Sequence, residues 1–489
     1  MPINEQQMSA QFKNDMIHTV QNMLGIQKMH IISDLHSPCP FKRIEIDESI
    51  SPETPVSLVM ILDLMNNFYD DYKRAHNAID RTYVIEKITD YFIYLTLLHE
   101  PHYHAYRISK FRTNISAENM RPAGTNDEMD FDVKRYITSD KTYKNILLLK
   151  NFLTHLNYLT TQTYESRSTT VSFLIFKDDA RNCREFLDDL GIDYIPLEKD
   201  ELTLNDINNY SKANRLVDSL SISYVVNEQY DILGFARKRH RAVKDILLTA
   251  NDSEKHSFVY LENRKIYWVV QKDLIVVYDN GQWKVKDYSV ISMLLQVMYA
   301  NTPNDAIYAA HFAKSVIKDL SMSNTGALFI FLTANMYSNE CKNLPYSDAQ
   351  LFHFLTRHDV KNTQGDVADT YKKILLNGHE TFKLSDPQLD SQLVKLIADV
   401  DGAIIIDSNM NLMSFGEMIV TQNLLDVHVH RLINGLGTKM YTQQNDTKSF
   451  RGGARSLAAL NASTYGLAIK VSEDGDISIY YRRELKWQI

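Results

Sequence analysis

The residue types best suited to holding a phosphate gather in the last third of the chain. A glycine pair, Gly452 and Gly453, precedes Arg455 at the start of a predicted helix. Such a turn presents free backbone N–H groups and the positive end of the helix dipole, and both attract a phosphate. Arg455 adds a planar guanidinium that can hold two phosphate oxygens. Asp401 lies where a predicted strand begins, and its carboxylate could bind a divalent cation or orient a ribose hydroxyl.

Four short segments of this region follow one another in a fixed order. They are Gly326-Ala327-Leu328, Asp401-Gly402-Ala403, Gly452-Gly453-Ala454-Arg455 and Val471-Ser472-Glu473. In this order, on a strand, a second strand, a helix start and a last strand, they resemble the diadenylate cyclase domain. That family has a GAL-type strand, a DGA strand followed by a hairpin, a G-T-R-H-R segment entering a helix, and a final strand ending near Ser-Glu. The resemblance covers residues 306–489 and says nothing about residues 1–220.

The resemblance implies a site and a reaction. In the family, two domains face each other with one ATP each, and the 3′-hydroxyl of one ATP attacks the α-phosphate of the other. Carried over, Asp401 is the catalytic residue and the ligand of a Mg²⁺ or Mn²⁺ ion. The implied nucleotide-binding residues are Gly402, Ala403, Arg451, Gly452, Gly453, Ala454, Arg455, Ser456, Ser472 and Glu473. The implied ligand is ATP or a cyclic dinucleotide, and the implied assembly is a homo-oligomer.

The helix-entry segment departs from the family pattern. Aligned on residues 453–459, it keeps the Gly, the first Arg and both Ala as Gly453, Arg455, Ala458 and Ala459. Ala454 replaces the Thr, Ser456 the His and Leu457 the second Arg, although Arg451 could supply a guanidinium from nearby. Losing two such contacts would remove several kcal/mol of transition-state stabilisation, about 3 kcal/mol for each typical contact.

Two functions are therefore compatible with this domain. In one, it condenses two ATP to cyclic di-AMP; in the other, it is a nucleotide sensor without catalysis. The altered segment favours the sensor, whereas the retained Asp401 favours the cyclase. A non-enzymatic scaffold that dimerises through the domain is a third alternative.

A different motif lies near the N-terminus. Asp34 and His36 follow a short apolar run, and this resembles the opening strand of calcineurin-like metallophosphoesterases. The later pieces at 365–366, 377–380 and 428–430 fit that family poorly in spacing and order. We therefore interpret Asp34 and His36 as a capped turn.

Two further clusters have simpler interpretations. Arg239, His240 and Arg241 reproduce R-H-R, but no Gly-Thr precedes them, so they are predicted to form a solvated basic turn. His99, His102 and His104 could bind zinc from an irregular segment, but no distant fourth ligand accompanies them. We interpret these histidines as a partly exposed helix end.

Periodicity predicts an α/β protein with three regions. Residues 1–165 have helical spacing, and residues 166–300 form an α/β unit followed by β-rich hairpins, including a turn at 279–281. The strand–helix–strand order at 169–197 indicates a parallel pair. Residues 301–489 are predicted to form a mixed sheet flanked by helices. Its helices are expected at 306–320, 391–400 and 456–464, and its strands at 326–334, 401–407, 411–420, 465–472 and 475–482.

Composition, net charge and cysteine content indicate the class of protein and its cellular compartment. The 489 residues are 44% apolar and 23% charged, enough for packed cores, and the net charge of −8 argues against a nucleic-acid-coating protein. Three cysteines without a CxxC pair fit a reducing compartment. The N-terminus lacks a signal-peptide pattern, and no apolar run is long enough for a membrane span. We expect a cytoplasmic protein.

Overall fold

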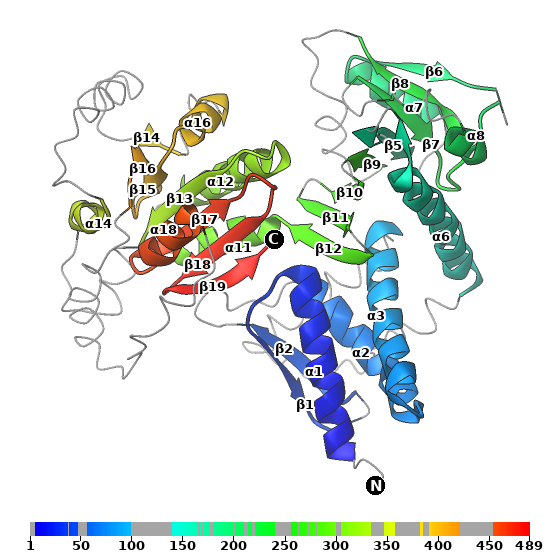
Figure 1. Cartoon of the computed structure of the whole chain (residues 1–489), viewed down its shortest axis with the longest axis horizontal. Helices are drawn as coiled ribbons and strands as arrows, with labels where there is room; N and C mark the ends of the chain where they lie inside the picture. Colours follow the sequence, from blue (N-terminus) through cyan, green and yellow to red (C-terminus); the bar gives the residue numbers. More distant parts are fainter. Residues whose placement is uncertain are drawn as a thin grey trace, which may run out of the picture. The chain divides into compact units, whose positions relative to one another are not determined.

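The structure is a computed structural model of the chain (Figure 1). It describes residues 5–37, 39–46, 56–98, 139–164, 167–168, 170–176, 180–198, 201–209, 214, 216–217, 221–239, 256–262, 264–271, 273–279, 281–299, 305–333, 347–356, 382–384, 391–419 and 453–489. The chain forms two compact units. The first comprises residues 1–24, 29–45 and 54–287, and the second comprises residues 25–28, 46–53 and 288–489.

The first unit contains both helices and strands. Its helices are α1 (Glu5–Leu24), α2 (Val56–Arg74), α3 (Ala78–Leu98), α6 (Asp140–Thr161), α7 (Ala180–Asp189) and α8 (Leu204–Asn209). Its strands are β1 (Met29–Ser33), β2 (Phe41–Ile46), β3 (Thr163–Tyr164), β4 (Arg167–Ser168), β5 (Val171–Phe176), β6 (Ile192–Pro196), β7 (Ile222–Val226), β8 (Ile232–Lys238), β9 (His256–Glu262), β10 (Lys265–Gln271), β11 (Leu274–Asp279) and β12 (Gln282–Asp287).

Eight of these strands form one mixed sheet in the order β12-β11-β10-β9-β5-β7-β8-β6. The central strand β5 pairs parallel to β7 and antiparallel to β9. All six residues of β5 are buried, as expected for a strand covered on both faces. The α6 helix packs against β9 and β10, and its Phe152 meets Phe173 of β5 edge-to-face and stacks on Tyr230, which lies between β7 and β8. The middle of the chain is thus built around a buried sheet.

Aromatic side chains hold the N-terminal helices to the β1–β2 hairpin. Phe12 of α1 lies 5.3 Å from Phe41 of β2 and 4.6 Å from Tyr72 of α2, measured between ring centroids. Tyr72 also donates a hydrogen bond to Asp15 at 2.7 Å. Because each ring buries a large apolar area, this cluster fixes α1 and α2 against the hairpin.

The second unit carries the four segments singled out in the sequence. Its helices are α11 (Ser289–Met298), α12 (Asp305–Met322), α14 (Asp348–Leu355), α16 (Ser391–Ala398) and α18 (Ala454–Ala462). Its strands are β13 (Ala327–Leu332), β14 (Phe382–Lys383), β15 (Ala403–Ile406), β16 (Asn411–Glu417), β17 (Gly466–Val471), β18 (Ile477–Tyr481) and β19 (Glu484–Gln488). They form a seven-stranded sheet in the order β14-β16-β15-β13-β17-β18-β19.

Helices cover both faces of this sheet (Figure 1). The β13 residues Leu328 and Ile330 belong to a core with Ala459 of α18 and Leu351 of α14. The alternate β13 residues point to the other face, since side chains alternate along a strand. On that face α12 packs against β17 and α16 against β15 and β16. This double cover explains why every residue of β13 is buried.

The α/β fold class and the mainly helical start of the chain are confirmed, and the predicted hairpins are present. The β17–β18 turn contains Gly475 at φ +84°, and the β11–β12 turn contains Gly281 at φ +83°. The expected parallel pair is wrong in one respect. The β5 and β6 strands run in the same direction, but β7 and β8 lie between them. The β1–β2 hairpin and β19 were not predicted from the sequence.

The units and the three predicted regions divide the chain differently. The helices of residues 1–165 and the strands of residues 166–287 fall in the first unit together. A short N-terminal segment, Gly25–Lys28, falls in the second unit, where Ile26 bridges to Trp487 of β19. Of the described helices, none combines the length and the apolar character needed to cross a bilayer.

Candidate functional site

The sheet of the second unit brings the four segments to one of its ends. The β15 strand runs parallel to β13, with Phe329 opposite Ile404, so both strands begin at the same end. The β17 strand is antiparallel to β13, and its last residue, Val471, lies opposite Ala327. The first turn of α18 reaches the same place through Arg455. Segments spread over almost 150 positions (326 to 473) therefore meet at one site.

Arg455 joins the segments physically. Its Nη1 donates a hydrogen bond to Glu473 Oε1 at 3.2 Å, and its Nη2 lies 3.7 Å from Asp401 Oδ1. The side chains of Asp401 and Glu473 are 89% and 79% exposed, and that of Arg455 is 36% exposed. Both carboxylates are thus open to solvent, and one guanidinium holds them together.

Gly326 makes room for this guanidinium. A Cβ atom at position 326 would lie 2.3 Å from Nη1 of Arg455 and 3.1 Å from Cγ of Glu473. Real Cβ atoms are essentially never found as close as 2.3 Å to another heavy atom, so a side chain here would displace the flexible end of Arg455 from the backbone. Gly326, in the first of the four segments, therefore provides space for the Arg455 side chain rather than a functional group.

Gly453 begins α18 as its N-cap, at φ −69° and ψ 176°. Gly453 and Ala454 are exposed, and the Gly453 carbonyl accepts hydrogen bonds from the amides of Ser456 and Leu457. Since the Ser456 amide is already bonded, the amides of Ala454 and Arg455, for which no carbonyl partner is found among the described residues, are those available to an anion. Arg451 and Gly452 lie outside the described residues.

Ser456 points inward and is 6% exposed. Its Oγ accepts a hydrogen bond from Lys470 Nζ of β17 at 2.9 Å. Ser456 also hydrogen-bonds Tyr480 of β18; burial raises the pKa of Tyr480, and its bonds to Ser456 and Ser478 oppose the rise. Lys470 and Tyr480 were missed in the sequence analysis, although a lysine within the apolar run of β17 was the available signal.

Other predicted site residues make packing and turn contacts. Ala403 is 1% exposed within the core under α18. Gly402 adopts φ +124°, and a Cβ there would lie 2.4 Å from the Gly416 carbonyl carbon, so two strands approach closely at this point. Ser472 is half-buried and donates its N–H to the Asp476 carbonyl at 2.8 Å, closing the β17–β18 turn.

The groups at this end of the sheet that could bind a metal ion are exposed carboxylates. Mg²⁺ and Mn²⁺ favour oxygen ligands, and Mg²⁺ is commonly held by one or two carboxylates together with water and substrate phosphates. Asp401 and Glu473, on either side of Arg455, fit that pattern. Within the described part of the chain, no three His, Cys, Asp or Glu residues group to form a metal site from protein alone.

A second polar cluster lies at the opposite end of the same sheet, after β13 and β15. Asp348, at the start of α14, accepts hydrogen bonds from the backbone N–H and the Oγ of Ser408, at 3.3 and 2.6 Å. Burial raises the pKa of Asp348; the Ser408 bonds oppose this, and the nearby Asp407 adds to it. Asp407 is 9% exposed and accepts bonds from Asn409 and Asn411. This cluster fastens α14 to the β15–β16 turn.

The described residues of the alternative motifs, Asp34, His36 and Arg239, form hydrogen bonds or ion pairs within the first unit. Asp34 Oδ1 accepts a hydrogen bond from the His36 backbone at 3.1 Å in the turn of the β1–β2 hairpin, as expected for a capped turn. Arg239 is ion-paired with Asp193 and Asp188. The remaining residues of those motifs lie outside the described part of the chain. They are His99, His102, His104, His240, Arg241 and residues 365–366, 377–380 and 428–430.

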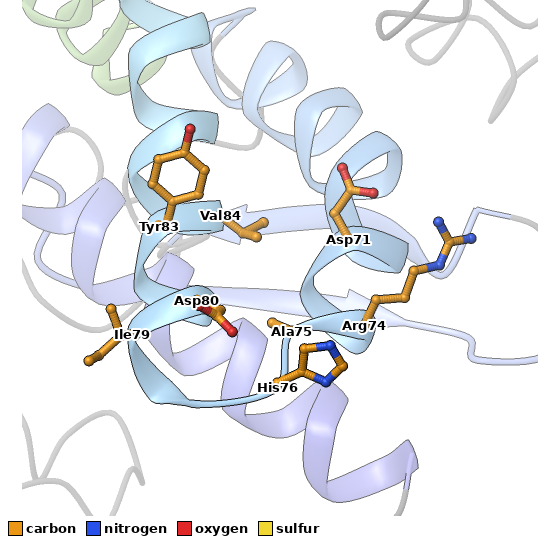
Figure 2. A pocket seen from close by; sticks show the side chains of 8 residues that line it. All are labelled: Asp71, Arg74, Ala75, His76, Ile79, Asp80, Tyr83 and Val84. Atoms are coloured by element: carbon orange, nitrogen blue, oxygen red, sulfur yellow. The ribbon is translucent and has the colours of Figure 1, made fainter.

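A hollow of about 570 Å³ lies in the first unit, where α2 turns into α3 (Figure 2). Acidic, basic and apolar side chains line it: Asp71, Arg74, Ala75, His76, Ile79, Asp80, Tyr83 and Val84. No residue singled out in the sequence is among these, so the hollow and the Arg455 site are separate features.

Comparison with known proteins adds little. The chain matches no protein-family model and no curated protein. It is similar to a solved structure described as the crystal structure of the hypothetical membrane spanning protein from Bacillus cereus, at 17% identity. That similarity covers 41% of this chain and 72% of the other, with a TM-score of 0.23. A likeness this weak indicates no function for this chain.

Proposed function

We propose that the second unit binds an adenine nucleotide at the sheet end that carries Asp401, Arg455 and Glu473. The observation that supports this most is the position of Arg455, which contacts two of the other three segments directly and lies against Gly326 of the third. The order of these segments resembles a nucleotide-binding family, and their meeting place presents both a cation and carboxylates.

Each group has a chemical task in this proposal. Arg455 grips phosphate oxygens with its planar fork, and the first amides of α18 add donors to the same phosphates. Asp401 and Glu473 hold a Mg²⁺ or Mn²⁺ ion that accompanies the nucleotide. That ion neutralises phosphate charge when bound.

Binding exchanges one set of ion pairs for another. In the structure Arg455 is shared between Asp401 and Glu473. Exposed ion pairs contribute only about 0–1 kcal/mol each, so releasing Arg455 costs little. A cation arriving at the carboxylates and a phosphate arriving at Arg455 replace the pairs together. Metal and nucleotide therefore bind cooperatively in this proposal.

Calorimetry tests the proposal. The full-length chain is titrated with ATP and with cyclic di-AMP, each with and without Mn²⁺. Replacing Arg455→Met should weaken binding about 10- to 100-fold, because a hydrogen bond to a charged group contributes about 1.5–3 kcal/mol. Arg74→Met, an exposed arginine of the first unit, is the matched control and should bind as wild type does. If folded wild-type protein gives no heat with either nucleotide, the proposal is wrong.

A finer proposal concerns the fate of the bound nucleotide. The exposed Asp401 leaves a carboxylate available for condensing two ATP to cyclic di-AMP across a homodimer, whereas Ser456 and Leu457 favour a sensor. Incubation with ATP and Mn²⁺, analysed by mass spectrometry at concentrations that allow dimerisation, separates the two. A cyclic dinucleotide that disappears in Asp401→Asn supports the cyclase. Bound but unreacted ATP supports the sensor.

A further inference from the structure

Lys470 lies in β17, directly beside the first turn of α18. Its Nζ donates a hydrogen bond to Ser456 Oγ at 2.9 Å, and Ser456 is the third residue of that helix. The hydroxyl is buried together with Tyr480 and Ser478 of β18. A hydroxyl group, rather than a carboxylate, therefore holds the ammonium group of this half-buried lysine.

The charge of Lys470 is not balanced by a carboxylate within the part of the chain that the structure describes. Three other lysines of the second unit are paired with carboxylates: Lys28 and Lys486 with Glu484, and Lys395 with Asp319. For Lys470 the Ser456 hydroxyl is the polar contact that the described residues supply. The ammonium group carries three donors, and this bond uses one of them.

The position of this charge is unfavourable in the absence of a ligand. A helix start bears a partial positive charge, so a cation placed beside it is repelled rather than held. Arg455 adds a second full charge one residue before Ser456. Arg455 is paired with Asp401 and Glu473, whereas no described carboxylate pairs with Lys470, so an anionic group is the partner that would balance the Lys470 charge beside the helix start.

We infer that Lys470 is a phosphate-binding residue that acts with the start of α18 and with Arg455 on a polyphosphate chain. The inference rests on the proposed nucleotide site, and it adds the residue that holds the phosphate farther from Asp401. Ser456 holds the ammonium group in place. Arg455 lies on the helix α18 and Lys470 on the strand β17, so the site is complete only when this helix packs against this strand.

Inorganic tripolyphosphate is the probe, because it tests the phosphate contacts without the base. The full-length chain is titrated calorimetrically with tripolyphosphate and, separately, with ATP. Lys470→Met should weaken tripolyphosphate binding about tenfold or more, whereas Lys470→Arg should stay within about threefold. Lys383→Met, at an exposed lysine of β14, is the matched control and should bind as wild type does. Lys470→Gln removes the charge but keeps a donor for Ser456, and it replaces the Met variant if that variant does not fold.

The outcomes separate the two proposals. Lys470-dependent tripolyphosphate binding supports this inference even if ATP binds no better than tripolyphosphate, a result that would contradict the nucleotide proposal alone. Wild-type affinity in folded Lys470→Met or Lys470→Gln overturns the inference, including when the melting temperature falls, because Lys470 would then be structural. Failure of wild-type protein to bind tripolyphosphate overturns it as well.

Discussion

The guanidinium of Arg455 occupies the space that a side chain at position 326 would need. The glycine matters because a charged group lies against its backbone, and that arrangement keeps Arg455 near Asp401 and Glu473. In the sequence, Gly326 is part of the Gly326-Ala327-Leu328 segment, and nothing there indicates a role for it. Its role depends on a residue more than a hundred positions away, so only the folded chain reveals it.

Gly326→Ala should therefore impair the site and spare the fold. We expect nucleotide affinity to fall about tenfold, because Arg455 must move and its charge-assisted contacts are lost. Calorimetry measures the affinity, and circular dichroism checks the fold. The double variant with Arg455→Met is the control. If the alanine acts through Arg455, it adds nothing once Arg455 is gone, and a further loss in the double variant would contradict this explanation.

At the scale of the elements, the strands of the second unit were predicted well from sequence. The β13, β15, β17 and β18 strands are apolar runs bounded by turn residues, and the β17–β18 turn has Gly475 at positive φ. The β15–β16 turn has Met410 at φ 62°, a conformation that its residue type does not predict. The β19 strand was not predicted, because its run Glu484–Gln488 mixes charged and apolar residues at a sheet edge. Local patterns identify such strands poorly, because the pairing partner is decisive.

The contacts between elements were harder to anticipate. The Lys470–Ser456 bond joins a strand to a helix, and the Asp348–Ser408 bond joins a helix start to a turn 60 positions away. Each is a partly buried polar pair, and the free energy of such a hydrogen bond depends on the groups around it. The sequence showed the residue types, and packing decided which ones meet.

The attachment of α14 should depend on pH. Because the folded chain raises the pKa of Asp348, protonation of Asp348 favours folding, and this contribution is lost as the pH rises from about 4 through the raised pKa. Asp348→Asn removes the buried charge and its repulsion from Asp407, yet keeps an acceptor for Ser408. We expect the variant to be more stable than wild type at pH 7, with a smaller difference near pH 4.

Urea denaturation of both proteins at pH 4.5 and pH 7 measures this effect. Asp348→Ala is the comparison, because it also removes the acceptor and should be destabilising at both values. A stability difference between wild type and Asp348→Asn that is the same at both pH values would contradict a raised pKa for Asp348.

At the scale of the whole molecule, the two compact units are not formed by two successive stretches of the chain. The second unit consists mainly of residues 288–489, yet it also contains Gly25–Lys28. This segment follows α1 and pairs with β19, with Gln488 donating its N–H to the Gly25 carbonyl at 2.9 Å. Lys28 and Lys486 both bond Glu484; burial alone would raise the pKa of Glu484, but these bonds outweigh it and lower that pKa. The edge of the C-terminal sheet therefore depends on residues near the N-terminus.

Gly25→Ala should loosen this edge. Gly25 has φ +69°, and a Cβ there would lie 1.5 Å from the Gln488 carbonyl oxygen. Strain at positive φ costs roughly 1–2 kcal/mol, and the clash adds to it. Hydrogen exchange of residues 484–489, followed by mass spectrometry, should become faster. Gly281→Ala is the matched control, with φ +83° but open space around it. Unchanged exchange at β19 in Gly25→Ala would contradict the pairing.

The pairing of Gly25–Lys28 with β19 also affects how the protein is made. Lys28 and Glu484 are separated by 456 positions, so their contact closes a loop of nearly the whole chain. During synthesis the N-terminal segment leaves the ribosome long before its partner strand exists. It must stay available until β19 has been made, because a contact of such high order cannot form earlier. Completion of this sheet edge is therefore a late event in folding, and a chain truncated before β19 would leave the edge of β18 unpaired.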